Sequence, residues 1–459
     1  MLDKATIQSL VLAPHVAPNS RHFFLRFRDR EGGRQFLSDQ LPIVADGMTD
    51  LADAGRPLLN VALSWTGLCA LDAFEGIGDA ADAADAFPGD FTEPTNALSV
   101  AAYGVSSPER WWEERFETPD IHASLHLYCS GEDRLEAATD AIRASARSRS
   151  VEELPATPDG PITGQVLGHD RAGLRKLHFG YSDGFSQPQV DWDGDGGDAT
   201  LYPRGHFLID EWDEKAESFP RREPWRGLVR HSSYLALAWM YQDVAAFNRF
   251  LRENAARVAR AGMSPVDAQE LLAAKMMGRW RDGTPLALSP DRPDPDLATH
   301  QFDFATDRDG VRCPIGSHVR IMNGRDQPLN FVNRTLFPAG FPRVIRRGAS
   351  YGPPLTVDGH DGTDRGILGM FICASAKQQF YFLMRWLGRT DFSDAFPDQA
   401  GQDPLFASRD VPGASRSFAM PTEGETVTLD GLPQLVRLKG VAIMLLPTLP
   451  LLRRLARSG

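Results

Sequence analysis

A carboxylate set in a turn between two glycines is the first feature of the sequence that suggests chemistry. Residues 178–188 place Asp183 between Gly180 and Gly184 and end on Pro188. The glycines allow positive φ and a close approach of the backbone to another group, and aspartate side chains bond locally in such turns. A carboxylate held in this way can accept a proton and return it. An ordinary surface turn explains the segment equally well when the segment is taken alone.

Arginines and one histidine form a second chemical feature further along the chain. Residues 312–347 hold seven arginines and a single acid, Asp326, in a chain whose formal net charge is −12. A basic block of this kind is usually a solvated or nucleic-acid-facing surface. Arginine is also the natural bidentate partner of ligand carboxylates. Because His318 lies inside the block, an anionic cofactor with an imidazole ligand is the interpretation that we prefer.

Three motifs, in this order, resemble those of the dye-decolourising peroxidases, a family of haem enzymes. They are Gly-x-x-Asp-Gly at residues 180–184, Cys-Pro-x-x-x-His-x-Arg at 313–320 and Ile-Arg-Arg-Gly-x-x-Tyr-Gly at 345–352. The resemblance continues through residues 277–286 and 364–371 and ends near residues 401–405. Three ordered motifs make the resemblance specific.

This resemblance implies a peroxidase that contains haem b and uses hydrogen peroxide to oxidise dyes, phenolic or other aromatic donors through a ferryl intermediate. It implies that His318 is the axial ligand of the haem iron, that Asp183 shuttles the proton and that Arg346 stabilises charge as the O–O bond breaks. Arg347 stays open as the alternative guanidinium, because the sequence does not show which of the two points inward. A non-catalytic haem-binding or haem-delivery protein on the same fold is the alternative function.

Further residues are candidates for holding the cofactor or for carrying electrons. Arg320 and Arg334 are candidates for binding the haem propionates. Asp403, in a Gly-x-Asp-Pro run, resembles the family carboxylate that accepts the second N–H of the axial histidine. Its neighbours Asp391, Asp394 and Asp398 compete for that role. The family uses surface aromatic residues as electron relays, and Tyr351 and Trp386 are candidates here.

The elements that must position these residues are a mixture of strands and helices. Residues 59–65 and 123–129 alternate as half-buried strands do, and the apolar run at 370–373 predicts a buried strand. Ser264 and Pro265 open a predicted helix that ends at Gly278. Helical spacing or composition predicts further helices around residues 79–86, 244–258 and 380–387. The lack of a regular βαβ alternation favours the α+β class.

The length of 459 residues predicts two domains. We place them at residues 1–150 and 165–459, and the proline-containing segment 143–163 is the predicted linker. The family resemblance implies two ferredoxin-like halves with antiparallel sheets and peripheral helices, and a haem pocket in the C-terminal half.

Bulk properties narrow the partners and the compartment. The net charge of −12 argues against nucleic acid and anionic membranes as partners. No secretory signal is visible, and the apolar stretch 441–452 is too short and too interrupted by proline to span a bilayer, so we expect a cytoplasmic protein. The four cysteines lack CxxC spacing and indicate reduced thiols. The expected partners are hydrogen peroxide and small aromatic reductants, and a homo-oligomer is left open.

Overall fold

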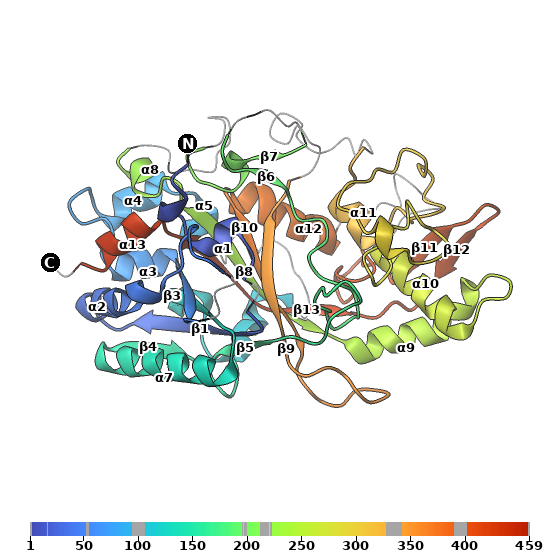
Figure 1. The fold of residues 1–459 in the computed structure, drawn as a ribbon, viewed down its shortest axis with the longest axis horizontal. Coiled ribbons are helices and arrows are strands. Elements are labelled where there is room, and N and C mark those ends of the chain that lie inside the picture. The colour runs from blue at the N-terminus through green and yellow to red at the C-terminus, as the bar shows by residue number, and fades with distance from the viewer. Residues whose placement is uncertain are drawn as a thin grey trace.

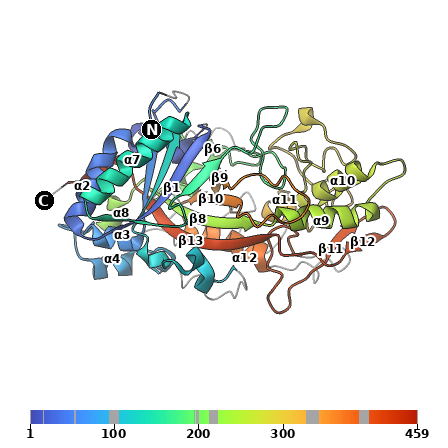
Figure 2. The same ribbon diagram turned by 90° about the horizontal axis from the view of Figure 1, so that it is seen from below.

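The computed structural model describes residues 2–15, 17–51, 55–93, 106–194, 196, 200–211, 220, 223–326, 342–389 and 402–457. Figure 1 shows the N-terminal elements on the left and the helices formed by residues 244–322 on the right, with long strands between them. The same arrangement is seen from below in Figure 2. No helix in the described ranges is long and apolar enough to cross a membrane.

One nine-stranded sheet, antiparallel at every pairing among the described residues, joins the two sides. Its strand order is β3-β2-β13-β8-β10-β9-β5-β1-β4, and β1 also pairs with β3, so the sheet closes on itself. The strands are β1 (Asn19–Phe27), β2 (Leu58–Leu63), β3 (Ala123–Cys129), β4 (Val151–Leu154), β5 (Ile162–Gln165), β8 (Ser233–Gln242), β9 (Ile345–Tyr351), β10 (Gly366–Cys373) and β13 (Val436–Leu446). Smaller strand pairs are β6 (Val190–Asp191) with β7 (Tyr202–Pro203), and β11 (Phe418–Pro421) with β12 (Thr426–Leu429).

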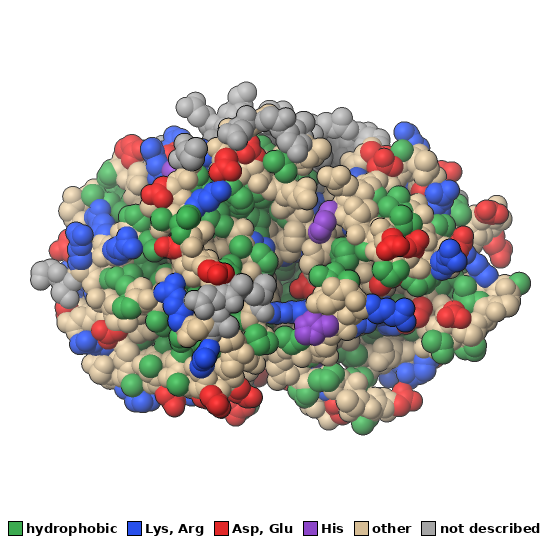
Figure 3. Space-filling view, viewed as in Figure 1, with side chains coloured by type: hydrophobic (Ala, Val, Ile, Leu, Met, Phe, Trp, Pro, Cys, Tyr) green, Lys and Arg blue, Asp and Glu red, His purple; other side chains and the backbone are tan. Residues whose placement is uncertain are grey.

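Helices cover the outside of this sheet (Figures 1 and 2). On the N-terminal side they include α2 (Arg30–Gln40), α3 (Trp65–Ala70), α4 (Ala80–Ala86), α7 (Glu132–Ser148) and the last helix, α13 (Leu449–Leu455). The other side has α9 (Val244–Asn254), α10 (Pro265–Met277), the short α11 (His318–Met322) and α12 (Phe382–Arg389). Acidic and basic side chains are interspersed over the face that Figure 3 shows.

Local sequence signals account for most of these elements, and the α+β class is confirmed. The Ser264 side chain accepts a hydrogen bond from the Asp267 N–H at the start of α10, and Gly278 ends that helix at φ +93°. These are the cap and the left-handed stop expected from the sequence. The predicted helices at 79–86 and 244–258 correspond to α4 and α9, and the predicted strand at 370–373 is the end of β10. The helix predicted at 380–387 is α12, preceded by a π-helical turn at Ala376–Tyr381.

Two expectations about the N-terminal strands are wrong in part. β3 lies where it was predicted, and β2 ends at Leu63 because Ser64 caps helix α3. Both strands are buried along their whole length and not half-buried. Their polar face points into the closed sheet, where Asn60 and His126 are fully buried and His126 Nδ1 lies 3.0 Å from His22 Nδ1. The polar and the apolar residues of these two strands therefore face two different buried environments, and neither face is exposed to solvent.

The predicted linker at residues 143–163 is also wrong. It contains the end of α7, the whole of β4 and the start of β5, and both strands pair with β1. The prolines of this segment occur only between the two strands, where no ladder hydrogen bond is needed. The division into domains at 1–150 and 165–459 stays a prediction, while the sheet itself takes strands from both segments.

Candidate active site

His318 is the first residue of α11, and a buried carboxylate holds its ring. Its Nδ1 lies 2.7 Å from Asp403 Oδ2. The Asp403 side chain has no exposed surface, whereas the His318 side chain is 24% exposed. The other carboxylate oxygen, Oδ1, accepts the backbone N–H groups of Leu405 and Phe406 at 2.9 and 2.7 Å. The structure thus brings together the two residues that the sequence analysis assigned to the axial-ligand side.

Hydrogen bonds from side chains to backbone carbonyls, which involve α10, also fix the start of α11. Ser317 precedes His318, and its hydroxyl donates to the Lys275 carbonyl at 2.6 Å. The buried Lys275 ammonium donates to the carbonyls of Val311 and Arg312 at 2.7 and 2.6 Å. Burial lowers the pKa of Lys275 to about 8. The segment that leads into His318 is therefore held in place by several hydrogen bonds.

Arg320 has partners that argue against its predicted role in binding propionate. It is 1% exposed and donates to Asp307 Oδ2 at 3.0 Å and to the Asp307 carbonyl at 2.6 Å. Its guanidinium also lies over the Phe304 ring, 4.3 Å from the centroid. Two residues along an α-helix turn a side chain by about 200°, so Arg320 projects to the side of α11 opposite to His318. Arg320 stabilises the short helix through a buried ion pair.

The Asp183 turn has the conformation that its glycines suggested. Gly180 and Gly184 adopt φ of +87° and +95°, and a Cβ on Gly180 would come within 2.9 Å of Arg281 Nε. Asp183 is exposed, and its Oδ1 accepts the Gly184 N–H at 2.7 Å. The Asp183 N–H donates to the Arg175 carbonyl at 2.8 Å. The turn presents a carboxylate outward from a fixed backbone.

Arg346 in β9 is bound to the segment that follows this turn. Its guanidinium donates to the Phe185 carbonyl. The Gln187 side chain brackets the Arg346 backbone, because Nε2 donates to the Arg346 carbonyl at 2.9 Å and Oε1 accepts the Arg346 N–H at 3.0 Å. Burial lowers the pKa of the Arg346 guanidinium, and the charge of Asp183 partly offsets this effect. Arg346 and Asp183 therefore lie close enough to interact electrostatically.

The choice between Arg346 and Arg347 follows from strand geometry. Arg347 points to the other side of β9, where its Nε donates to the Leu10 carbonyl at 3.0 Å and its Nη2 to the Val11 carbonyl at 3.5 Å. Consecutive side chains of a strand face opposite ways. Arg346 is therefore the arginine on the side of the Asp183 turn.

A cavity of about 490 Å³ lies beside this turn. Its lining includes Ser186, Gln187, His300, Phe302, Arg325 and Arg343. It thus joins the segment after Asp183, the segment just after α11 and the residues that lead into β9. Figure 3 shows a hollow near the middle of one face, with basic and histidine side chains beside it.

Four buried or half-buried arginines gather around this region: Arg279, Arg325, Arg343 and Arg346. None of them forms an ion pair with a carboxylate in the described part of the chain. Arg279 Nε and both Nε and Nη2 of Arg325 are buried without a hydrogen-bond partner among the described residues. Burial is the main cause that lowers the pKa of Arg279 to about 9, and the charges of the neighbouring arginines add to it. Burial also lowers the pKa of Arg325 to about 10, and the charge of Arg343 adds to this effect.

Sequence reasoning missed most of this cluster. Arg279 donates to Ser186 Oγ at 2.9 Å, Arg343 donates to the Ser186 carbonyl at 2.6 Å, and His300 Nδ1 accepts the Ser186 N–H at 2.9 Å. Arg325 and Arg343 were visible only as members of a basic block. Arg279 belongs to a stretch that resembles the family, which was the one signal that pointed to it.

The two predicted electron relays have different surroundings. Tyr351 is 5% exposed and donates to Asp364 Oδ1 at 3.2 Å. It is not a surface residue, so it does not match the prediction of direct contact with a bulky donor. Trp386 is half-buried, and its Nε1 donates to the Ile321 carbonyl of α11 at 2.9 Å. Arg334, Asp391, Asp394 and Asp398 lie outside the described residues.

Known proteins of similar sequence are peroxidases. No family model matches the chain. Peroxidase 2 of Mycetinis scorodonius is 28% identical over 446 residues, which cover 91% of this chain and 79% of that protein. A dye-decolorizing peroxidase of Exidia glandulosa is 28% identical over 440 residues, with 91% and 79% covered.

Solved structures show the same fold along the whole chain. A fungal DyP-type peroxidase from Auricularia auricula-judae superposes with a TM-score of 0.79 at 22% identity, and 100% of both chains is covered. A dye-decolorizing peroxidase in complex with 2,6-dimethoxyphenol gives 0.77 at 24% identity, again over 100% of both chains. The fold is therefore that of the DyP-type peroxidases. The related sequences are likewise peroxidases, most of them of the dye-decolorizing type.

Proposed function

We propose that the chain binds haem b through His318 and uses hydrogen peroxide to oxidise small aromatic donors. The observation that carries this proposal is the pairing of His318 Nδ1 with the buried Asp403 carboxylate at 2.7 Å. A histidine that binds a metal commonly donates its second N–H to such a carboxylate, which orients the ring and raises its basicity. Because Nδ1 is engaged, Nε2 is the nitrogen that would bind iron.

The arginine cluster fits the other chemical feature of haem, its two propionates. Buried guanidinium nitrogens without partners are costly, and a carboxylate ligand supplies the missing acceptors. Arg325 and Arg279 have such nitrogens among the described residues. Arg325 lines the cavity as well. We therefore assign propionate binding to Arg325 and, as a second candidate, to Arg279. This assignment replaces the earlier candidate Arg320.

When bound, the haem iron supplies the electrons that reduce peroxide and later takes electrons from the donor. Asp183 accepts the proton of one peroxide oxygen and returns it to the other, because its carboxylate is exposed and its turn is fixed. Arg346 stabilises the negative charge on the departing oxygen with a guanidinium that is already held in place. The two hydrogen bonds between the Gln187 side chain and the Arg346 backbone orient Arg346.

Phenolic donors are the proposed reductants. The relative with a bound 2,6-dimethoxyphenol supports this class. The predicted cytoplasmic location and the oligomeric state stay predictions.

The test of the distal pair is the rate of peroxide-dependent phenol oxidation by haem-loaded protein. We expect Asp183→Asn to lower the turnover number by ~10²–10⁴-fold, because the proton shuttle is lost. We expect Arg346→Leu to lower it by ~10²–10³-fold, because the charge stabilisation is lost. Arg347→Leu is the matched control and should keep its turnover, since that side chain points to the N-terminal segment.

Unchanged turnover in both Asp183→Asn and Arg346→Leu would refute the assignment of these roles. A haem-loaded wild-type protein that binds haem tightly but oxidises no donor would favour the haem-delivery alternative.

A further inference from the structure

The loop that carries Asp403 is held by a buried arginine, Arg409. This side chain is 3% exposed. Its Nη2 donates to the carbonyl of Asp403, and its Nη1 donates to Gln402 Oε1 at 3.2 Å and to the Ser415 carbonyl at 2.6 Å. One guanidinium therefore contacts Asp403 itself, the residue before it and a segment further along the chain.

A second set of bonds fixes Arg409 in turn. Its N–H donates to Gln434 Oε1 at 2.6 Å, and Gln434 Nε2 donates to the Val436 carbonyl at 2.6 Å. Val436 is the first residue of β13, a central strand of the sheet. The loop of Asp403 is thus connected through Arg409 and Gln434 to the start of a central strand of the sheet.

This connection matters because, among the described residues, the backbone N–H groups that the Asp403 carboxylate accepts lie within its own turn. These contacts to Leu405 and Phe406 would move with that turn. The 2.7 Å contact with His318 spans 85 residues and depends on where the whole loop sits. A hydrogen bond weakens steeply when its geometry is lost.

We propose that Arg409 is a positioning residue that holds the Asp403 carboxylate against His318 and so sets how much negative charge the proximal imidazole carries. This inference rests on the proposed role of His318 as the axial ligand. Arginine suits this position because its planar fork serves three acceptors, which a lysine ammonium on a flexible stem does less well.

The test uses haem-loaded protein and reads the iron–imidazole bond directly. In the ferrous state, the iron–histidine stretching frequency in resonance Raman spectra and the ferric/ferrous reduction potential both report the basicity of the ligand. We expect Asp403→Asn to lower the frequency and raise the potential. Arg409→Met should also lower the frequency and raise the potential, each by less than Asp403→Asn does. Both values for Arg409→Lys should lie between those of Arg409→Met and wild type.

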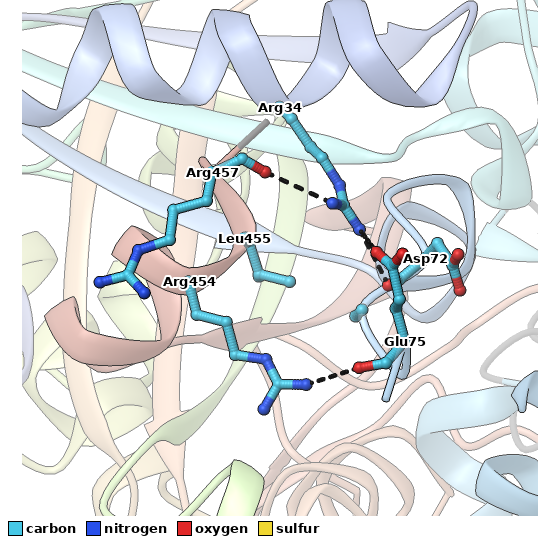
Figure 4. A pocket seen from close by; sticks show the side chains of 7 residues that line it. Arg34, Asp72, Glu75, Arg454, Leu455 and Arg457 are labelled. Atoms are coloured by element: carbon cyan, nitrogen blue, oxygen red, sulfur yellow. Dashed lines mark hydrogen bonds and ion pairs between the residues drawn. The ribbon is translucent and has the colours of Figure 1, made fainter. Parts of the chain in front are cut away.

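Arg34 provides a matched control. It is also a buried arginine and donates to the Leu71 carbonyl at 3.0 Å. Its other partners are the carbonyls of Asp72 and Arg457 at 3.2 and 3.3 Å and the Glu75 carboxylate at 2.9 Å (Figure 4). It lies in α2, at the other end of the molecule from α11 (Figures 1 and 2). Arg34→Met should lower the thermal midpoint of unfolding without any shift in the iron–histidine frequency.

The double variant separates positioning from a general loss of structure. If Arg409 acts through Asp403, adding Arg409→Met to Asp403→Asn should cause no further shift of the frequency. An unshifted frequency in both Arg409→Met and Arg409→Lys would overturn the inference. An additional shift in the double variant as large as that in the single variant would also overturn it. Should His318→Ala keep the iron–histidine band, the axial assignment itself fails, which is a separate result.

Discussion

Replacing Gln187 by leucine should slow the reaction with peroxide, because this side chain orients the backbone of Arg346. Two hydrogen bonds, at 2.9 and 3.0 Å, are lost with the amide. Each hydrogen bond contributes about 0.5–1.5 kcal/mol net, so the substitution removes about 1–3 kcal/mol of the free energy that holds the Arg346 backbone in place. If this loss falls entirely on the correctly placed Arg346, the rate drops roughly 5- to 160-fold, since each 1.36 kcal/mol is a factor of ten.

The drop should fall toward the lower end of that range, because other contacts remain. The Arg346 guanidinium still donates to the Phe185 carbonyl, and Arg343 still donates to the Ser186 carbonyl. The assay is stopped-flow absorbance of haem-loaded protein mixed with excess peroxide, with the second-order rate constant as the measured quantity. Gln165→Leu is the control, because Gln165 is an exposed glutamine of β5 that pairs with β9.

The reasoning would be refuted by a Gln187→Leu protein that reacts with peroxide as fast as wild type while its thermal midpoint falls. That result would mean that Gln187 stabilises the loop but does not orient Arg346.

Three further expectations concern the cofactor and the stability of the fold. Arg325→Met should weaken haem binding, measured by haem titration, because a partner of the propionates is lost; an unchanged dissociation constant would contradict this role. Arg320→Met should lower the free energy of unfolding by about 3–5 kcal/mol in urea titrations, because the Asp307 carboxylate is left buried without its partner; a loss below about 1 kcal/mol would show that this ion pair is not needed. Burial lowers the pKa of both His15 and His22 to about 3. The unfolded chain therefore binds more protons than the folded chain between pH 6.5 and 3, so the stability is complete above that window. It should fall with decreasing pH by up to about 1.4 kcal/mol per pH unit for each histidine, and a free energy that stays constant in this window would argue against it.

The sequence could indicate candidate residues that stand in short motifs. Asp183, His318 and Arg346 each stand in a run of a few residues, and the structure places Asp183 and Arg346 on the same side of β9. The pair of His318 and Asp403 was accessible only through the family resemblance, since 85 residues separate them.

Residues that depend on long-range packing could not be predicted. The approach of Arg279 and His300 to Ser186 joins segments about a hundred residues apart, and no local pattern encodes it. The ion pair of Arg320 with Asp307 could not be predicted either, because a count of charges does not show which side of a helix a side chain faces. The linker was misplaced because its prolines mark a connection between two short strands, and composition alone does not separate the two cases.

The most direct test of the central claim is a haem titration followed by absorption spectroscopy of wild type, His318→Ala and His360→Ala. His360 is an exposed histidine that contacts the Tyr241 hydroxyl, so it serves as the control. We predict a one-to-one complex with a Soret band in wild type and in His360→Ala, and a lost or clearly shifted band in His318→Ala alone. An identical spectrum and affinity in His318→Ala would contradict the assignment of His318 as the axial ligand.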